Sequence, residues 1–228
     1  MTLFTPLPPL GAIFDMDGLL MDSEPHWRQA ELEVFRPLGV PLTEEMCLQT
    51  MGLRIDEVVQ YWLDRHPWAD PDIPAVADQI VERLVVRILS EGEGLPGAVE
   101  AVRRCKARGL RMALATSAPK SVIPATLTAL GIQDAFEVLC SAEDDALGKP
   151  HPAVYLRAAE SLRLPPQRCL AFEDSINGMV SARAAQTIVI AVPGPEGRGR
   201  PEFSLAAQTL HSLETVDDAW LDALGVGR

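Results

Sequence analysis

The chain begins with a short apolar stretch and then changes to a long series of helical patterns. Residues 11–14 form an apolar run, which predicts a buried strand. From residue 24 onward the apolar positions recur at spacings of three and four, which is typical of amphipathic helices. No segment of residues 22–93 predicts a strand, and we divide this part into helices at about 24–38, 44–49, 55–65 and 72–91.

After residue 94 the pattern alternates between helices and short apolar strands. Strands are predicted at 110–116, 136–140, 169–172 and 187–192, with helices at 97–108, 120–130, 152–162 and 175–185. This alternation predicts an α/β fold with a Rossmann-like parallel sheet that is covered on both faces, and a four-helix insert after the first strand. Ligands of such folds bind outside the carboxyl ends of the strands.

The composition limits the classes of partner. The chain has 228 residues, 47% of them hydrophobic, and a formal net charge of −12, which argues against nucleic acid or an anionic membrane as a partner. The N-terminus lacks the basic and apolar regions of a signal peptide, and no apolar run approaches the length of a membrane span. We expect a cytoplasmic protein whose four scattered cysteines are reduced core thiols.

Two carboxylates follow the first strand. Asp15 and Asp17 would point the same way at its carboxyl end, and Gly18 would let the chain turn. Carboxylates this close repel each other unless a proton or a cation lies between them, and a hard divalent ion such as Mg²⁺ would serve. A strand followed by an acidic turn explains this segment alone equally well.

Polar side chains also follow the later strands of the predicted sheet. Each alone has an ordinary explanation, such as a helix cap, an acidic helix N-terminus or a solvated surface lysine. Together with the acidic pair they would form a site for Mg²⁺ and a phosphoryl group. These residues are Thr116, Ser117, Lys149, Glu173 and Asp174.

Four short motifs, in chain order, resemble those of the haloacid dehalogenase superfamily. They are Asp-Met-Asp-Gly-Leu (15–19), Ala-Thr-Ser (115–117), Gly-Lys-Pro-His-Pro (148–152) and Phe-Glu-Asp-Ser-Ile-Asn-Gly (172–178). The helical insert is similar to the cap of the beta-phosphoglucomutase-like branch. The resemblance implies a catalytic core of residues 1–21 and 94–228 and a cap of residues 22–93.

Further motifs look most like those of the sugar-phosphate phosphatases in this branch, the 2-deoxyglucose-6-phosphate or hexitol phosphatases. These are Asp-Ser-Glu-Pro (22–25), Gly-Leu-Arg-Ile-Asp (52–56) and Glu-Asp-Ser-Ile-Asn-Gly (173–178). The resemblance implies a Mg²⁺-dependent phosphatase that hydrolyses small sugar or sugar-alcohol phosphates through an aspartyl-phosphate.

The resemblance also implies roles for the residues at the strand ends. Asp15 would be the nucleophile, and Asp17 the general acid and then the base. Thr116 and the backbone N–H of Ser117 would bind phosphoryl oxygens, and Lys149 would pair with Asp15 and the phosphate and so keep the nucleophile ionised.

The metal and substrate assignments follow in the same way. The implied Mg²⁺ ligands are Asp15, the backbone carbonyl of Asp17, and Asp174, with Glu173 nearby or acting through water. For the substrate, the candidates are Asn177, which would help to orient this shell, and Glu24 and Arg54 at the cap. A surface arginine at a helix N-terminus is an equal alternative for Arg54.

A hexose-phosphate mutase is the alternative within the enzyme class. Mutases of this branch carry a histidine twelve residues after the nucleophile, where this chain has Trp27. Tryptophan does not transfer protons, which disfavours this alternative, although the adjacent His26 keeps it open.

Two non-enzymatic classes are weaker alternatives. A receiver-like signalling domain would carry an aspartate after a middle strand, and the strand at 136–140 is followed by Ser-Ala-Glu. A catalytically inactive sugar-phosphate binder would not need Asp17. We therefore expect a small phosphorylated metabolite as the partner, and a monomer, because a site closed between cap and core requires no second chain.

Overall fold

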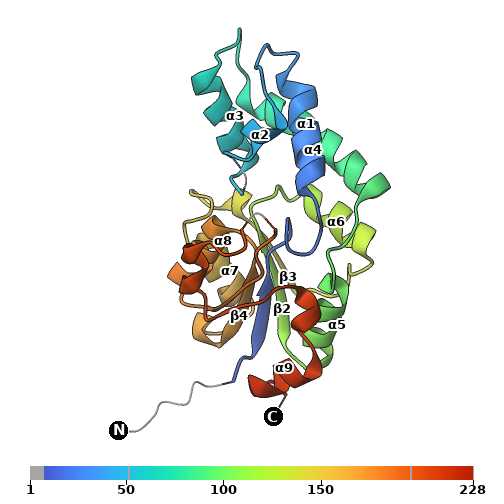
Figure 1. The fold of residues 1–228 in the computed structure, drawn as a ribbon, viewed down its shortest axis with the longest axis vertical. Helices are drawn as coiled ribbons and strands as arrows, with labels where there is room; N and C mark the ends of the chain where they lie inside the picture. Colours follow the sequence, from blue (N-terminus) through green and yellow to red (C-terminus); the bar gives the residue numbers. More distant parts are fainter. Residues whose placement is uncertain (1–7, 51, 196, 228) are drawn as a thin grey trace.

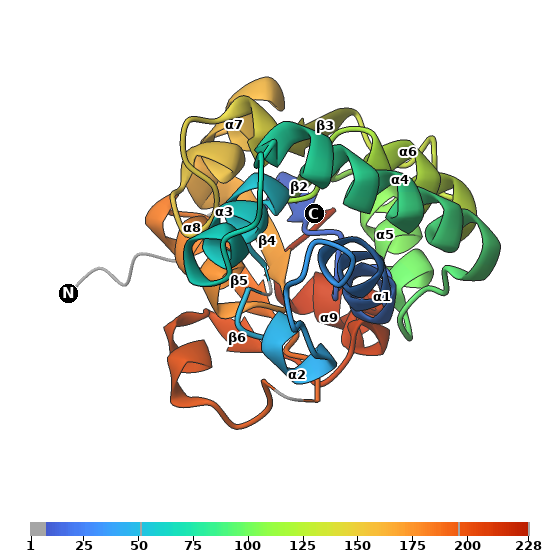
Figure 2. The ribbon, with the colours of Figure 1, turned by 90° about the horizontal axis from the view of Figure 1, so that it is seen from above.

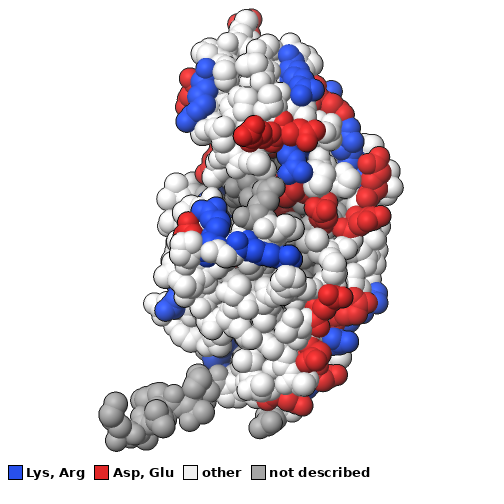
Figure 3. All heavy atoms as spheres, viewed as in Figure 1, with Lys and Arg blue, Asp and Glu red and all other residues white. Residues whose placement is uncertain are grey.

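The structure, a computed structural model, describes residues 8–50, 52–195 and 197–227. The first seven residues of the predicted core segment and Met51, which lies in a predicted helix break, are outside the described residues. Figure 1 shows a lower part built around a sheet and an upper part made of helices. The charged side chains on the face drawn in Figure 3 include both signs, with acidic groups gathered along the lower right edge.

The described residues form one six-stranded sheet in the order β3-β2-β1-β4-β5-β6, and every pairing is parallel. The predicted α/β fold is therefore confirmed. The strands are β1 (Gly11–Phe14), β2 (Arg111–Thr116), β3 (Val138–Ser141), β4 (Cys169–Glu173), β5 (Ile188–Ala191) and β6 (Gln208–Thr209).

Helices cover both faces of the sheet (Figures 1 and 2). Within β1, Ala12 and Phe14 belong to the cluster that includes α5 and α6, whereas Ile13 belongs to the cluster that includes α7 and α8. Alternate residues of a strand point to opposite faces, so an uninterrupted apolar run is what a sheet buried on both faces requires. The helices are α5 (Ala98–Ala107), α6 (Val122–Leu130), α7 (Ala153–Ser161) and α8 (Ile176–Ala184).

Four helices lie between β1 and α5 in the described part of the chain. They are α1 (Glu24–Phe35), α2 (Glu44–Cys47), α3 (Ile55–Arg65) and α4 (Ile73–Glu91). The side chains of Thr43 and Asp72 cap α2 and α4 by accepting backbone N–H bonds, at 3.3 and 3.1 Å. Figure 1 places these helices above the carboxyl ends of the strands, and α4 also packs against α6.

Several element ends differ from the prediction. The first predicted helix was to reach residue 38, but α1 ends at Phe35, and Pro37 follows shortly after. The strand β6 and the helix α9 (Asp218–Ala223) lie in a segment for which no element was predicted. Short 3-10 helices were not predicted either: η1 (Ala142–Asp144), η2 (Pro166–Arg168), η3 (Pro201–Leu205) and η4 (Leu213–Thr215).

Two further observations concern the expected environment. All four cysteines are buried and free of disulfide bonds. Among the described residues, no helix has the combination of length and apolar character that crossing a bilayer needs.

Candidate active site

Three strand ends meet where the chain leaves β1. Phe14 is in register with Leu114 of β2 and with Phe172 of β4, and the backbone N–H of Asp15 donates to the Phe172 carbonyl oxygen at 3.0 Å. The parallel strands therefore carry Asp15, Thr116 and Glu173 to the same edge of the sheet. Of these, Asp15 and Thr116 line a cavity that extends to α1 and α2.

Lys149 is the buried cation of this edge. Its Nζ lies 2.9 Å from Asp15 Oδ1 and donates to Glu173 Oε1 at 2.7 Å and to the Ala115 carbonyl oxygen at 3.1 Å. Burial lowers the pKa of Lys149, but the adjacent carboxylates of Asp15 and Glu173 outweigh it and raise the pKa above its ordinary value. The lysine is therefore shared by two carboxylates and does not serve Asp15 alone.

Glu173 is held by groups other than a metal. The Tyr155 hydroxyl donates to Glu173 Oε1 at 2.5 Å, and the Ser175 hydroxyl donates to Oε2 at 3.3 Å. A Cβ at Gly178 would lie only 1.9 Å from Glu173 Oε1, so only glycine leaves room for this carboxylate. These contacts place Glu173 as the residue that fixes Lys149, whereas its predicted metal contact stays a prediction.

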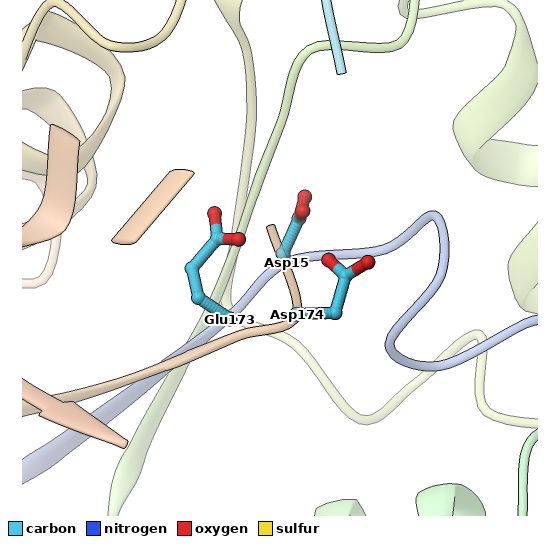
Figure 4. A group of neighbouring side chains, drawn as sticks. All are labelled: Asp15, Glu173 and Asp174. Atoms are coloured by element: carbon cyan, nitrogen blue, oxygen red, sulfur yellow. The ribbon is translucent and has the colours of Figure 1, made fainter. Parts of the chain in front are cut away.

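Three carboxylates lie close together at the carboxyl ends of β1 and β4 (Figure 4). Asp15, Glu173 and Asp174 each offer an oxygen, and these oxygens lie within 4.8 Å of one another. Burial, followed by the charge of Glu173, raises the pKa of Asp15 to about 8, against the opposing effect of Lys149. Burial and the neighbouring carboxylates also raise the pKa of Asp174 well above its usual range.

This arrangement fits a hard divalent cation. Asp174 Oδ1 is buried and has no hydrogen-bond partner among the described residues. A Cβ at Gly18 would lie 2.3 Å from Asp174 Oδ2, so the glycine allows this close approach. With one lysine for the three carboxylates of Asp15, Glu173 and Asp174, a divalent cation would supply the missing positive charge and favour the ionised form of Asp15. The predicted role of Lys149, which with the metal would keep Asp15 ionised, stays a prediction.

Asp17 is held by three side chains. Its Oδ1 accepts from the Ser23 hydroxyl at 2.6 Å and from Trp27 Nε1 at 3.1 Å, and its Oδ2 accepts from the Thr116 hydroxyl at 3.3 Å. Three donors fix the direction of the carboxylate. Trp27, at the position where a mutase of this branch would carry histidine, thus holds the predicted acid/base in place.

The upper wall of the cavity comes from the helical part. The cap-side polar residues that line it are Glu24, Trp27, Arg28, Glu31, Cys47 and Thr50, and Ser117 lines it from the core. The predicted substrate contact Glu24 is therefore at the cavity.

Arg54 and Asn177 lie outside this lining. Arg54 donates to the carbonyl oxygens of Ala142 at 3.3 Å and Asp145 at 2.7 Å, and pairs with Asp56 at 2.8 Å. It therefore joins the helical part to the core beside the cavity. Asn177 lies in the first turn of α8. Their substrate roles stay predictions.

Sequence reasoning missed two residues that hold the site. Ser23 lies inside a quoted motif, yet no chemical role was assigned to it, although a serine six residues from an aspartate can donate to it across a turn. Tyr155 lies on α7, and nothing in the local sequence indicates that its hydroxyl meets Glu173.

Comparisons with known proteins find relatives along most of the chain. The model of the haloacid dehalogenase-like hydrolases matches residues 10–186. Hexitol phosphatase B of Escherichia coli K12 is 44% identical over 210 residues, which cover 92% of this chain and 95% of the relative.

Solved structures show the same fold. CbbY of Rhodobacter sphaeroides, solved with phosphate, superposes with a TM-score of 0.86 and 29% identity over 94% of this chain and 99% of that one. The beta-phosphoglucomutase of Clostridium difficile superposes with a TM-score of 0.82 at 21% identity, over 95% of this chain and 96% of that one. The second likeness supports the fold alone.

Proposed function

The chain belongs to the haloacid dehalogenase-like hydrolases and is a phosphoric monoester hydrolase, and we propose that it hydrolyses sugar or sugar-alcohol phosphates through an aspartyl-phosphate on Asp15 with the help of Mg²⁺. The observation that carries the proposal is the meeting of Asp15, Lys149 and Asp174 in one cavity at the carboxyl edge of the sheet. A nucleophile, a buried cation and an oxygen-only metal site are the parts that phosphoryl transfer needs.

The first step forms the phosphoryl-enzyme. A carboxylate oxygen of Asp15 attacks the phosphorus, and the bond from phosphorus to the sugar oxygen breaks. Asp17 donates a proton to the departing oxygen, so the sugar leaves as a neutral alcohol. Ser23 and Trp27 hold Asp17 in the direction this transfer requires.

The second step releases phosphate. A water molecule attacks the phosphorus of the aspartyl-phosphate, and Asp17 accepts the proton of that water. The acyl phosphate bond breaks, which frees phosphate and regenerates the Asp15 carboxylate. Thr116 and Lys149 line the cavity beside Asp15 and would bind the phosphoryl oxygens.

The metal would be held by Asp15, Asp174 and the backbone carbonyl of Asp17. When bound, it neutralises the phosphoryl oxygens and lowers the pKa of Asp15, so that the nucleophile is ionised. The buried, unpartnered oxygen of Asp174 supports this assignment.

The substrate class rests on the relatives and on the cavity. The hexitol phosphatase relative spans nearly the whole chain, and polar side chains line the cap side of the cavity. The indole of Trp27 donates to Asp17 but cannot accept a proton from a sugar hydroxyl, which favours water over a second sugar as the phosphoryl acceptor.

A phosphate-release screen tests the proposal. Hexose, hexitol, pentose and triose phosphates are offered to the purified chain with Mg²⁺, and glucose 1-phosphate is also followed for glucose 6-phosphate. We expect phosphate from hexose or hexitol phosphates and no isomerised sugar phosphate. Isomerisation without phosphate release would replace the phosphatase by a mutase. The cytoplasmic location and the monomeric state stay predictions.

A further inference from the structure

The helix α1 presents one polar face to the cavity. Glu24, Trp27, Arg28 and Glu31 all line it, and their spacings of three and four residues put them on the same side of a helix. Trp27 reaches the Asp17 carboxylate at the sheet end of this face. Glu31 lies one turn further along and meets α2.

Glu31 is unusual for a helix residue because its carboxyl is buried. Only 6% of the residue is exposed, and Oε2 has no hydrogen-bond partner among the described residues. Burial raises the pKa of Glu31 to about 8, while Cys47 and the charge of Arg28 lower it and the charge of Glu24 raises it. Burial therefore favours the uncharged form of the carboxyl.

The surroundings do not complete its hydrogen bonds. The Cys47 thiol, which faces Glu31 from α2, donates to the Thr43 carbonyl oxygen at 3.4 Å. A buried polar group that is left unpaired costs free energy, so a carboxyl kept in this position inside a cavity is suited to a ligand that pairs with it.

We propose that the cap end of the cavity is a subsite for uncharged hydroxyl groups, and that Glu31 hydrogen-bonds a hydroxyl of the substrate remote from its phosphate. This inference rests on the proposed function, which places the phosphate at Asp15 and Lys149.

The chemistry of the two partners matches. A protonated carboxyl both donates and accepts, as does a hydroxyl group, so one side chain can satisfy either direction of the hydrogen bond. A second phosphate or carboxylate at this end of the substrate would meet a buried acid and lose water. Directly beside Glu31 the subsite therefore favours a hydroxyl over a second anionic group.

The test compares two monoesters on the full chain with Mg²⁺. Sorbitol 6-phosphate carries hydroxyls beyond its phosphate, whereas p-nitrophenyl phosphate carries none. Glu31→Leu removes the polar atoms, and Glu31→Gln keeps the size and a donor and acceptor. Glu33→Gln, an exposed residue of the same helix, is the control.

For Glu31→Leu we expect kcat/KM for sorbitol 6-phosphate to fall about tenfold through KM, with p-nitrophenyl phosphate unchanged, which is the scale of one lost hydrogen bond. Glu31→Gln and the control should stay near the wild type. Equal losses on both monoesters, or no loss on either, would overturn the subsite and leave the proposed phosphatase standing. A wild-type chain that hydrolyses p-nitrophenyl phosphate but no sugar phosphate would overturn both.

A pH series keeps the test decisive if Glu31→Leu does not fold. Ionisation of Glu31 removes its donor proton, so KM of the wild type for sorbitol 6-phosphate should rise between about pH 7 and 9, and Glu31→Gln should abolish the rise. The same rise in Glu31→Gln would contradict the inference.

Discussion

At the sheet end of the cavity, Asp15 and Glu173 share a buried lysine, whereas at the helical end Glu31 has a buried oxygen without a partner among the described residues. Burial raises the pKa of both Asp15 and Glu31 to about 8. Asp15 lies beside Lys149 and two further carboxylates, those of Glu173 and Asp174, and this group suits a divalent metal. Glu31 belongs to no such group, and the cation that acts on it is Arg28.

The free-energy cost of burying an ionised carboxylate would therefore be offset in different ways at the two ends of the cavity. At the sheet end, Lys149 and the proposed metal would restore the charge of Asp15, which would then act as a nucleophile toward an anionic phosphoryl group. At the helical end, the carboxyl stays protonated and suits an uncharged hydroxyl. The two ends would thus divide the chemistry from the choice of substrate.

Removing the charge at the sheet end should give the largest effect. Asp15→Asn removes the proposed nucleophile, and we expect phosphate release from sugar phosphates to fall at least about 10⁴-fold while the fold is kept. Asp22→Asn, an exposed aspartate nearby, is the control and should leave the rate unchanged. Turnover retained in Asp15→Asn would refute the mechanism.

Removing the metal should abolish activity in a reversible way. EDTA leaves Lys149 as the only cation for the acidic cluster among the described residues, and Asp15 should then be largely protonated at neutral pH. Added Mg²⁺ should restore phosphate release in full, and it should raise the melting temperature of the wild type more than that of Asp174→Asn. Activity indifferent to chelation would remove the metal assignment.

The buried Glu31 at the helical end should make the free energy of unfolding depend on pH. The pKa of Glu31 lies above its unfolded value of 4.5, so the folded state loses stability as the pH rises from about 4.5 to about 8, and the loss levels off above this range. Urea unfolding should show Glu31→Gln gaining about 4 kcal/mol relative to the wild type across this window. If the free energies of unfolding of the wild type and of Glu31→Gln changed in parallel with pH, the pKa of Glu31 would not be raised in the folded state.

Trp27 joins the two ends, and its replacement should cost less than that of a catalytic carboxylate. Trp27→Phe keeps the ring but removes the N–H donor to Asp17, while Ser23 and Thr116 still hold this carboxylate. We expect kcat to fall about tenfold with little change in KM. Trp68→Phe, elsewhere in the helical part, should change neither constant. A change confined to KM would make Trp27 a substrate contact instead.

The smallest effect is expected at the edge between the two parts. Arg54→Ala removes the hydrogen bonds to the Ala142 and Asp145 carbonyls, so the helical part should close less firmly over the core and KM should rise a few-fold. Arg83→Ala, which loses a surface ion pair with Glu33 and a hydrogen bond to the Gln79 carbonyl within α4, should leave KM unchanged. If Arg54→Ala kept the wild-type KM for every substrate, Arg54 would have no role in substrate binding.

The sheet end was accessible from the sequence because its residues follow apolar strands. Asp15, Thr116 and Asp174 each stand at or just after a strand, and parallel strands bring their carboxyl ends to one edge. The sequence did not show that the Tyr155 hydroxyl donates a hydrogen bond to Glu173. Tyr155 lies on α7 and meets this carboxylate only through tertiary packing.

The helical end was much less accessible. The spacing of α1 identifies an amphipathic helix, but it does not tell whether Glu31 faces solvent or a cavity. The direction of the Arg54 side chain likewise depends on how the helices lie on the core. The short strand β6 and the helix α9 were missed because a two-residue strand and a six-residue helix carry too little periodicity to recognise.

The most direct test of the account is to locate the transferred phosphoryl group. In Asp17→Asn the water that breaks down the phosphoryl-enzyme is no longer activated, and an aryl phosphate can still react because its leaving group needs no acid. After rapid quenching, tandem mass spectrometry should find phosphate on the side chain of Asp15. Phosphate on another residue, or hydrolysis without any phosphorylated Asp15, would contradict the central claim that the sheet end of this cavity performs covalent phosphoryl transfer.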